Sequence, residues 1–316
     1  MIKIGLVGAG IIAGDHKRAI YQNDDCIISA VCDINIERAE KLVEGTEAKV
    51  YSDYREMAEK EELDGVIINL PHFLHKESTI YFLEHNIPTL IEKPMAMTED
   101  ECQDMINVSE KTGTPLAIGH VQKYFAPHRY LKELSKSGKL GKLCAYRESK
   151  NRDYFVNRPE WFLKKEMAGG GILMNYGAHA LDRLFYITDE NAEKVVAFGN
   201  NFLNDKNIEA SSQLLLKLSD GASAALTFCG CKTPGFDECY IYYTNATAKI
   251  VGCDELWLSV AAGPFEKVEL PKNDVINMQM REFIKFIKNE ENELVTPAYG
   301  KKVIAVLEEA IKQIGE

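Results

Sequence analysis

The segment from Gly169 to Asp182 holds an amide, an imidazole and a carboxylate that could together form a reaction surface. On a regular helix, Asn175, His179 and Asp182 stand at i, i+4 and i+7, so they share one stripe. An imidazole with a reference pKa of about 6.5 can take up or release a proton near neutral pH. A buried helix whose polar stripe is only hydrogen-bonded is the alternative, and this segment alone leaves both open.

A second set of residues has the spacing of a phosphate-binding turn. The apolar run 2–7 predicts a strand, and Gly8-Ala-Gly10-Ile-Ile-Ala13 leads from it into a helix-like segment. Gly8 permits the tight turn, Gly10 lets a pyrophosphate approach the backbone, and the small Ala13 allows close helix–strand packing. The helix N-terminus then faces the phosphates. The pattern therefore predicts a dinucleotide site, with an ordinary glycine-rich turn as the alternative.

Asp33 follows the next apolar run, 27–32, and lies 25 residues after Gly8. A carboxylate there can accept hydrogen bonds from the ribose hydroxyls and would repel a 2′-phosphate. Ile34 and Asn35 come next, so no Arg or Ser directly follows to neutralise a phosphate. Arg38, one helical turn further on, is expected to face solvent. These residues favour NAD over NADP.

The elements that must position these residues alternate between strands and helices up to about residue 121. Repeated β-α units of this kind form a doubly wound parallel sheet that binds ligands at the carboxyl ends of its strands. Lys93 follows one such strand end. The predicted elements are a helix at 51–60, strands at 65–70, 89–91 and 116–119, a helix opening at 71–75, and a helix at 98–111.

Beyond residue 121 this alternation stops, and short strand candidates separated by turn residues take over. The chain therefore divides into a dinucleotide-binding domain, residues 1–121, and a second domain, residues 122–316. Strands are predicted at 195–203, 212–218, 222–229, 238–243, 248–251 and 255–260, and helices at 275–288 and 297–314.

Composition narrows the class of protein. The 316 residues carry a net charge of −11 without a basic cluster, which argues against a nucleic-acid partner. No apolar run reaches the length of a membrane span, and no His/Cys cluster predicts a metal site. The eight cysteines include no CxxC pair, and Cys229 and Cys231 are expected to be buried free thiols on one face of a strand. We expect a soluble protein of the reducing cytoplasm.

Several motifs in order along the chain resemble the glucose–fructose oxidoreductase/inositol dehydrogenase family, Gfo/Idh/MocA. The resemblance lies in the glycine turn followed by His16, in Pro71-x-x-x-His75, in Glu92-Lys93-Pro94, in Tyr124-Phe125-x-Pro127 with Gly138 and Gly141, and in Gly169-Gly-Gly through His179 to Asp182.

The resemblance implies a Rossmann domain followed by an α+β domain with a large, open, mostly antiparallel sheet. In this family the open face of that sheet commonly forms a subunit interface, which implies a homodimer or homotetramer. The residues that the resemblance and the turn pattern together assign to cofactor binding are Gly8, Gly10, Ile11, Ile12, Ala13, Asp33, Leu70, Pro71, His75, Glu92 and Lys93. For His75 the alternative role is helix packing, and His16 is expected to close the first helix against the sheet. A cis bond before Pro94 is also implied.

The family's dehydrogenases surround the substrate carbinol with the lysine of Glu-Lys-Pro and with the Asp and His of the second motif. Carried over, these residues are Lys93, Asn175 and His179. Asn175 departs from the usual Asp, so it can orient a partner but cannot take up a proton. Asp182 is a candidate for the missing carboxylate. The alternative is that Asp182 forms a salt link with a purely structural role. The expected substrate-contacting residues are Lys123, Arg152, Asp153, Tyr154 and Asn175.

These residues lead to one prediction with two rivals. The prediction is an NAD-dependent oxidoreductase that acts on a hydroxyl or keto carbon of a sugar, sugar derivative or inositol. One rival is a glycoside hydrolase of the same family that uses bound NAD, and the other is a non-catalytic NAD(H)-binding regulator. The particular sugar or polyol stays open.

Overall fold

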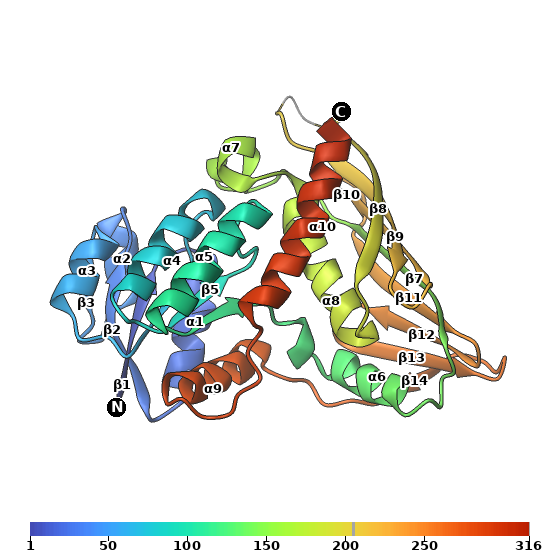
Figure 1. The fold of residues 1–316 in the computed structure, drawn as a ribbon, viewed down its shortest axis with the longest axis horizontal. Coiled ribbons are helices and arrows are strands. Elements are labelled where there is room, and N and C mark those ends of the chain that lie inside the picture. Colours follow the sequence, from blue (N-terminus) through green and yellow to red (C-terminus); the bar gives the residue numbers. More distant parts are fainter. Residues whose placement is uncertain (204–205, 316) are drawn as a thin grey trace. The chain divides into compact units, whose positions relative to one another are not determined.

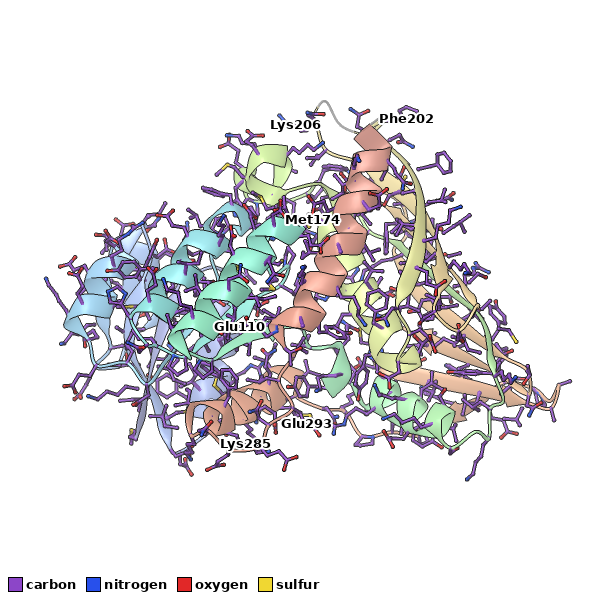
Figure 2. All side chains as sticks on the ribbon, in the orientation of Figure 1. Glu110, Met174, Phe202, Lys206, Lys285 and Glu293 are labelled. Carbon is purple, nitrogen blue, oxygen red and sulfur yellow. The ribbon has the colours of Figure 1, made fainter. Side chains whose placement is uncertain are left out.

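The fold of the chain is given by a computed structural model that describes residues 1–203 and 206–315. Phe202 and Lys206, labelled in Figure 2, lie on either side of the interval between these ranges. The chain forms two compact units, which Figure 1 shows as ribbons. Unit 1 comprises Met1–Val121 and Asp274–Ile304, and unit 2 comprises Gln122–Asn273 and Ala305–Glu316. No helix of the described residues is long and apolar enough to cross a membrane.

Unit 1 contains a six-stranded parallel sheet in the order β3-β2-β1-β4-β5-β6. Its strands are buried on both faces, which explains their continuous apolar sequences. The strands are β1 (Ile2–Val7), β2 (Cys26–Cys32), β3 (Lys49–Tyr51), β4 (Gly65–Ile68), β5 (Thr89–Glu92) and β6 (Leu116–Gly119).

The helices of unit 1 cover the two faces of this sheet. The helices α4 and α5 lie side by side in Figure 1, whereas α1 packs against α9. The helix bounds are α1 (Ile11–Tyr21), α2 (Ile36–Leu42), α3 (Tyr54–Lys60), the 3₁₀ turn η1 (His72–Leu74), α4 (His75–Glu84), α5 (Glu99–Thr112) and α9 (Val275–Ile287). The last helix, α10 (Pro297–Gly315), begins in unit 1 and belongs to unit 2 from Ala305 onward. Thr98 caps α5, because its hydroxyl accepts from the Glu101 amide, and the two residues have the spacing of a capping box.

The packing of α9 differs from the predicted division, which assigned residues 122–316 to one domain. Met280, Phe283 and Ile284 of α9 are buried in a core that includes Ile4 of β1 and Ile20 of α1. The region beyond α9 also joins the sheet, because the Ile118 amide donates to the Val295 carbonyl. The apolar face of α9 is evident in the sequence, but its partner lies some 260 residues away along the chain (from Ile20 to Met280) and is set by tertiary packing.

Unit 2 contains an eight-stranded sheet in the order β14-β13-β12-β11-β7-β10-β9-β8. All pairs are antiparallel except β7 with β10, which makes the sheet mostly antiparallel, as predicted. The strands are β7 (Leu143–Asn151), β8 (Ala192–Asn200), β9 (Ser211–Leu218), β10 (Ser223–Cys229), β11 (Phe236–Tyr243), β12 (Ala246–Val251), β13 (Glu255–Val260) and β14 (Glu266–Val268).

One face of this sheet carries the helices, and its strands alternate accordingly. In β9, Leu214, Leu216 and Leu218 are buried, whereas Leu215 is 59% exposed on the opposite face. Figure 1 shows α6, α8 and the last turns of α10 on the helix-bearing face. The helical segments are the 3₁₀ turn η2 (Gln122–Tyr124), α6 (Ala126–Lys136), the 3₁₀ turn η3 (Glu160–Leu163), α7 (Lys165–Ala168), the π-helical turn η4 (Leu173–Gly177) and α8 (Ala178–Thr188).

Candidate active site

The glycine turn between β1 and α1 has the geometry that its sequence predicts. Gly8 has φ +93°, and a Cβ there would lie 2.7 Å from the carbonyl oxygen of Asn69. At Gly10 a Cβ would meet no atom within 4 Å, so the backbone faces open space there. Gly8 is thus required by the turn, and Gly10 leaves room for a group to approach the N-terminus of α1.

Asp33 is held in place by two backbone amides. Its Oδ2 accepts from Ala9 at 2.8 Å, its Oδ1 accepts from Asn35 at 2.8 Å, and the residue is only 7% exposed. This arrangement fixes the carboxylate beside the glycine turn, where a ribose-binding acid is needed.

Arg38 is closer to Asp33 than the sequence suggested. Its side chain is 55% exposed, as expected for a residue facing solvent, yet its Nη1 lies 3.6 Å from Asp33 Oδ2. An open depression of about 630 Å³ beside it is lined by Ile34, Asn35, Ile36, Glu37 and Arg38. A cation therefore lies where a 2′-phosphate would need one.

The residues present fit a dinucleotide. Ile11 and Ile34 are 91% and 93% exposed, leaving apolar surface at the rim of the turn for a ligand to cover. Both side-chain polar atoms of Asn69 are buried and find no hydrogen-bond partner among the described residues. Asn69 follows β4 beside Gly8, so a ligand at this edge could satisfy them. Asn69 was not predicted from the sequence, where its only signal was an amide at the end of an otherwise apolar strand.

His75 joins two of the predicted cofactor segments. Its Nδ1 lies 2.9 Å from the Pro94 carbonyl and its Nε2 lies 2.8 Å from the Leu70 carbonyl. Burial lowers the pKa of His75, and hydrogen bonds to these carbonyls oppose that shift. A neutral imidazole can donate to only one of the two oxygens. His75 is 1% exposed and links the Leu70–Pro71 corner to the loop after Lys93.

Glu92 of the Glu-Lys-Pro motif pairs with the first helix. Its Oε1 lies 2.9 Å from His16 Nε2, and its Oε2 accepts from the Lys93 amide at 3.1 Å. Burial raises the pKa of Glu92, but the hydrogen bond and charge of His16, together with Lys93, outweigh burial and hold it below its usual value. His16 thus connects α1 to β5 through a buried side-chain pair. The bond between Lys93 and Pro94 is cis, as the resemblance implied.

In unit 2 the second motif is not the regular α-helix that its spacing predicted. Leu173–Gly177 form a π-helical turn that carries Asn175, and α8 begins at Ala178. Met174, labelled in Figure 2, belongs to the same turn. Such turns often occur at functional sites, and they rotate the following side chains relative to an α-helix. Asn175 is 7% exposed, and His179 is partly exposed on the next turn.

Asp182 and Tyr154 support this segment from within unit 2. Asp182 is 1% exposed, and its Oδ2 accepts from the Gln122 amide at 3.1 Å. Tyr154 is fully buried, and its hydroxyl donates to the Gly171 carbonyl at 3.1 Å and also hydrogen-bonds the Asn175 side chain. The Tyr154 hydroxyl, predicted to contact substrate, therefore faces the glycine segment.

The other predicted substrate residues lie nearer the surface. Arg152 is exposed, Asp153 is partly exposed, and Lys123 lies with its ammonium 5.8 Å from the ring centre of Tyr124. Arg152 follows β7 directly, and its amide donates to the Cys229 carbonyl. Their contact with substrate stays a prediction.

Glu209 and Arg158 were not predicted from the sequence. Glu209 Oε1 accepts from the amides of Gly171 and Leu173 at 2.8 and 2.9 Å, so it anchors the glycine segment from 36 to 38 residues away. A Cβ on Gly171 would lie 2.2 Å from the Glu209 carbonyl oxygen, which explains the glycine. Arg158 donates to the Tyr176 hydroxyl at 3.1 Å and to the Tyr154 carbonyl at 3.0 Å. Neither residue belongs to a motif, so spacing could not reveal it.

The structure thus groups the predicted residues into two sets. The turn residues, Asp33, the Leu70–Pro71 corner, His75, Glu92 and Lys93 belong to unit 1, at the carboxyl edge of its sheet. Asn175, His179, Asp182 and the substrate candidates belong to unit 2.

Comparison with known proteins identifies the family from two domain models. A family model described as "Oxidoreductase family, NAD-binding Rossmann fold" matches residues 2–120, and a GFO/IDH/MocA C-terminal domain model matches residues 128–249. D-glucoside 3-dehydrogenase of Escherichia coli strain K12 is 30% identical over 199 residues, which cover 62% of this chain and 56% of that protein. Inositol 2-dehydrogenase of Salmonella typhimurium strain LT2 is 32% identical over 144 residues, which cover 44% of this chain and 43% of that protein.

A solved levoglucosan dehydrogenase, in complex with NADH and L-sorbose, shares the fold. Its TM-score is 0.89 at 17% identity, over 100% of this chain and 97% of that chain. This chain spans about half the length of the curated relatives it first matches. Because both domain models match in order and together cover most of the sequence, the chain belongs to the Gfo/Idh/MocA family of NAD-binding oxidoreductases.

Proposed function

We propose that the protein is an NAD-dependent oxidoreductase acting on a hydroxyl or keto carbon of a sugar, sugar derivative or inositol. The observation that carries the proposal is His179 of unit 2, a partly exposed imidazole on the turn after a π-helical segment. Unit 1 of the same chain has a glycine turn with the Asp33 carboxylate held beside it. The names of the D-glucoside and inositol dehydrogenases among its relatives support this substrate class.

The proposed chemistry assigns a role to each of three side chains. A bound nicotinamide would accept a hydride from the carbinol carbon, or return one to a carbonyl. His179 takes the hydroxyl proton during oxidation and gives it back during reduction. The Lys93 ammonium hydrogen-bonds the carbinol oxygen and stabilises negative charge that develops on it. Asn175 orients without exchanging a proton, because an amide has no acidic group in this pH range.

We propose NAD as the preferred cofactor. Asp33 supports this choice, because its carboxylate is fixed by two amides and would repel a 2′-phosphate. Arg38 at 3.6 Å weakens the discrimination, since a guanidinium can pair with that phosphate. The expected preference is therefore for NAD, with measurable use of NADP.

We further propose that the protein is a cytoplasmic homodimer or homotetramer whose partner surface is the open face of the eight-stranded sheet. On this face Phe198 of β8 is 71% exposed and Leu215 of β9 is 59% exposed. Large apolar side chains exposed together in this way are typical of a surface that binds another protein. Eight free thiols are typical of a reducing compartment. The small-molecule substrate class agrees with a net charge of −11, which disfavours nucleic acid.

The experiment that tests the activity is a screen for NADH formation with sugars and inositols, using the wild-type protein and His179→Ala. The variant should lose roughly 10²- to 10⁴-fold in turnover, the usual effect of removing a general base. Its Kd for NAD should change little, because His179 belongs to the other compact unit from the dinucleotide turn. His85→Ala is the matched control, since His85 is an exposed histidine at the end of α4.

Each alternative outcome has a distinct signature. Full activity in His179→Ala would remove that residue from the mechanism. Release of a sugar from a glycoside without accumulation of NADH would identify the hydrolase instead. Tight NAD(H) binding with no turnover of any sugar, polyol or glycoside would favour a regulator.

A further inference from the structure

Two cysteines at the end of β10 lie in direct contact. Cys229 is the last residue of the strand, Gly230 follows, and the sulfurs of Cys229 and Cys231 are 2.9 Å apart. A disulfide bond is about 2.05 Å long, so the two sulfurs need to approach by less than about 1 Å. Both side chains are partly exposed, so a small reagent can reach them. Buried free thiols were expected here from the sequence, and the contact between them was not evident from spacing.

The backbone of this Cys-Gly-Cys segment holds residues of the candidate site. The Cys229 carbonyl accepts from the Arg152 amide at 3.1 Å, and the Gly230 carbonyl accepts from the Tyr154 amide at 3.4 Å. On its other side the Gly230 amide donates to the Ala210 carbonyl at 2.9 Å, next to Glu209. A Cβ on Gly230 would lie 3.0 to 3.1 Å from atoms of Ala210, Tyr154 and Phe155, so there is little free space around this glycine.

We propose that Cys229 and Cys231 are a site of reversible oxidation, at which a peroxide converts the thiol pair into an intrachain disulfide. One sulfur, as a thiolate, attacks a peroxide oxygen; the O–O bond breaks, hydroxide leaves, and a sulfenic acid forms. The second sulfur then attacks the first, the S–S bond forms, the S–O bond breaks, and water leaves. Two electrons pass from the sulfurs to the peroxide, which is reduced to water.

The surroundings of the pair limit how readily it is oxidised. The hydrogen bond to Cys229, followed by burial, raises the pKa of the Cys231 thiol, which lowers the fraction of reactive thiolate. In a reducing compartment the glutathione and thioredoxin systems would return the disulfide to two thiols.

Oxidation should alter the segment from Arg152 to Tyr154. Joining residues i and i+2 through their sulfurs changes the torsions at Gly230, and the carbonyls of Cys229 and Gly230 move with them. Those carbonyls hold the amides of Arg152 and Tyr154, so both residues shift. This consequence rests on the proposed function and on the predicted contact of Arg152 and Asp153 with the sugar, whereas formation of the disulfide does not.

The covalent step is tested by mass spectrometry on the full chain. The reduced protein is desalted, treated with hydrogen peroxide, and analysed intact and as peptides without reduction. The expected result is the loss of two hydrogens, mapped to the peptide with Cys229 and Cys231 and reversed by dithiothreitol. Cys229→Ser and Cys231→Ser should each abolish that mass change. Cys144→Ser should retain it, because Cys144 is an exposed cysteine away from the pair.

Three results would refute the proposal that Cys229 and Cys231 form a reversible disulfide. They are stepwise addition of oxygen at either sulfur without loss of hydrogens, disulfide-linked dimers in place of the intrachain bond, and persistence of the mass change in both serine variants. None of these readouts needs a substrate, so they remain informative if the sugar screen fails.

The consequence for catalysis is measured on a substrate found in the screen. Oxidised wild-type protein should show at least a several-fold higher KM, with an unchanged Kd for NAD, and reduction should restore the KM. An unchanged KM after complete disulfide formation would refute the link to the Arg152–Tyr154 segment.

Discussion

At the scale of a single residue, the proposed preference for NAD depends on Asp33. Two amide hydrogen bonds hold its carboxylate beside the glycine turn, so its position does not depend on a bound ligand. Arg38 lies 3.6 Å away. Among the described residues that line the neighbouring depression, it is the only one with a positive charge. Cofactor selectivity should therefore depend on the balance between these two side chains.

Asp33→Ala should weaken NAD binding by about 1.5–3 kcal/mol, or roughly 10- to 150-fold in Kd, the cost of losing a charged hydrogen bond. NADP should bind better than in the wild type, because Arg38 is released to pair with the 2′-phosphate. Calorimetric titration with both cofactors measures the two effects.

The double variant Asp33→Ala/Arg38→Ala provides the control for this prediction. It should lose the gain in NADP affinity while NAD binding stays weak. Unchanged selectivity in Asp33→Ala would exclude Asp33 from the cofactor site, and an NADP gain that survives in the double variant would exclude Arg38.

At the scale of elements, the glycine segment before the π-helical turn depends on an anchor from a distant part of the chain. Glu209 precedes β9, yet its carboxylate accepts the amides of Gly171 and Leu173, where the π-helical turn begins. Burial raises the pKa of Glu209 against the opposing effect of these hydrogen bonds. The turn that presents Asn175 and His179 is thus fixed by a buried carboxyl group outside the motif.

Glu209→Ala should destabilise the protein by about 1–3 kcal/mol, because two buried amides lose their acceptor. Glu209→Gln keeps an acceptor oxygen and should retain most of the stability and turnover. Urea unfolding gives the stability, and kcat on a substrate from the screen gives the effect on positioning. Glu193→Gln is the matched control, since it removes only a surface pair with Lys217. Equal losses in Glu209→Ala and Glu193→Gln would contradict the anchoring role.

The buried pair of His16 and Glu92 links two elements of unit 1 and should make stability pH-dependent. The folded-state pKa of Glu92 is depressed, so its contribution is fully present above its unfolded pKa of about 4.3 and is lost as pH falls through the folded value. Glu92→Gln should cost about 1–3 kcal/mol near neutral pH, and this difference should shrink in acid.

Urea unfolding of wild type and Glu92→Gln over a series of pH values tests this pair in the absence of cofactor. A difference that stays constant below the unfolded pKa would show that Glu92 gains no stability from ionisation. Glu59→Gln, at an exposed glutamate of α3, should show no comparable pH dependence.

At the scale of the whole molecule, the C-terminal part of the chain completes the first unit. Phe283 of α9 is fully buried against the core of β1 and α1. A truncated chain that ended near residue 121 would expose this core, so we expect the dinucleotide-binding unit to need both of its segments.

Phe283→Ala should lower the free energy of unfolding by about 3–5 kcal/mol, the usual cost of emptying a buried aromatic site. Phe202→Ala, at a side chain that is 87% exposed, should change it by no more than about 0.5 kcal/mol. Denaturant unfolding compares the two variants, and a similar small change in both would contradict the packing of α9 into unit 1.

Much of unit 1 could be predicted from its sequence, because parallel strands buried on both faces leave continuous apolar runs. The short edge strand β3 and the helix α2 were not predicted, since neither has such a run. In unit 2 the missed strands were the short edge strand β14 and β7, and β7 is the only strand that pairs in parallel with β10 among the described residues. The sequence of β7 contains Arg147, Glu148 and Lys150, and charged residues at this density are typical of an exposed segment.

The sequence by itself determined the local chemistry: the turn at Gly8 and Gly10, the acid at Asp33, the Glu-Lys-Pro loop and the order Asn175–His179–Asp182. Each depends on residues that are close together along the chain, where steric limits and periodicity act directly. Only the tertiary structure decided that Glu209 anchors Gly171, that α9 belongs to unit 1, and that the turn carrying Asn175 is π-helical. These features arise because burial and hydrogen bonding join groups far apart in the chain, and no local spacing encodes that pairing.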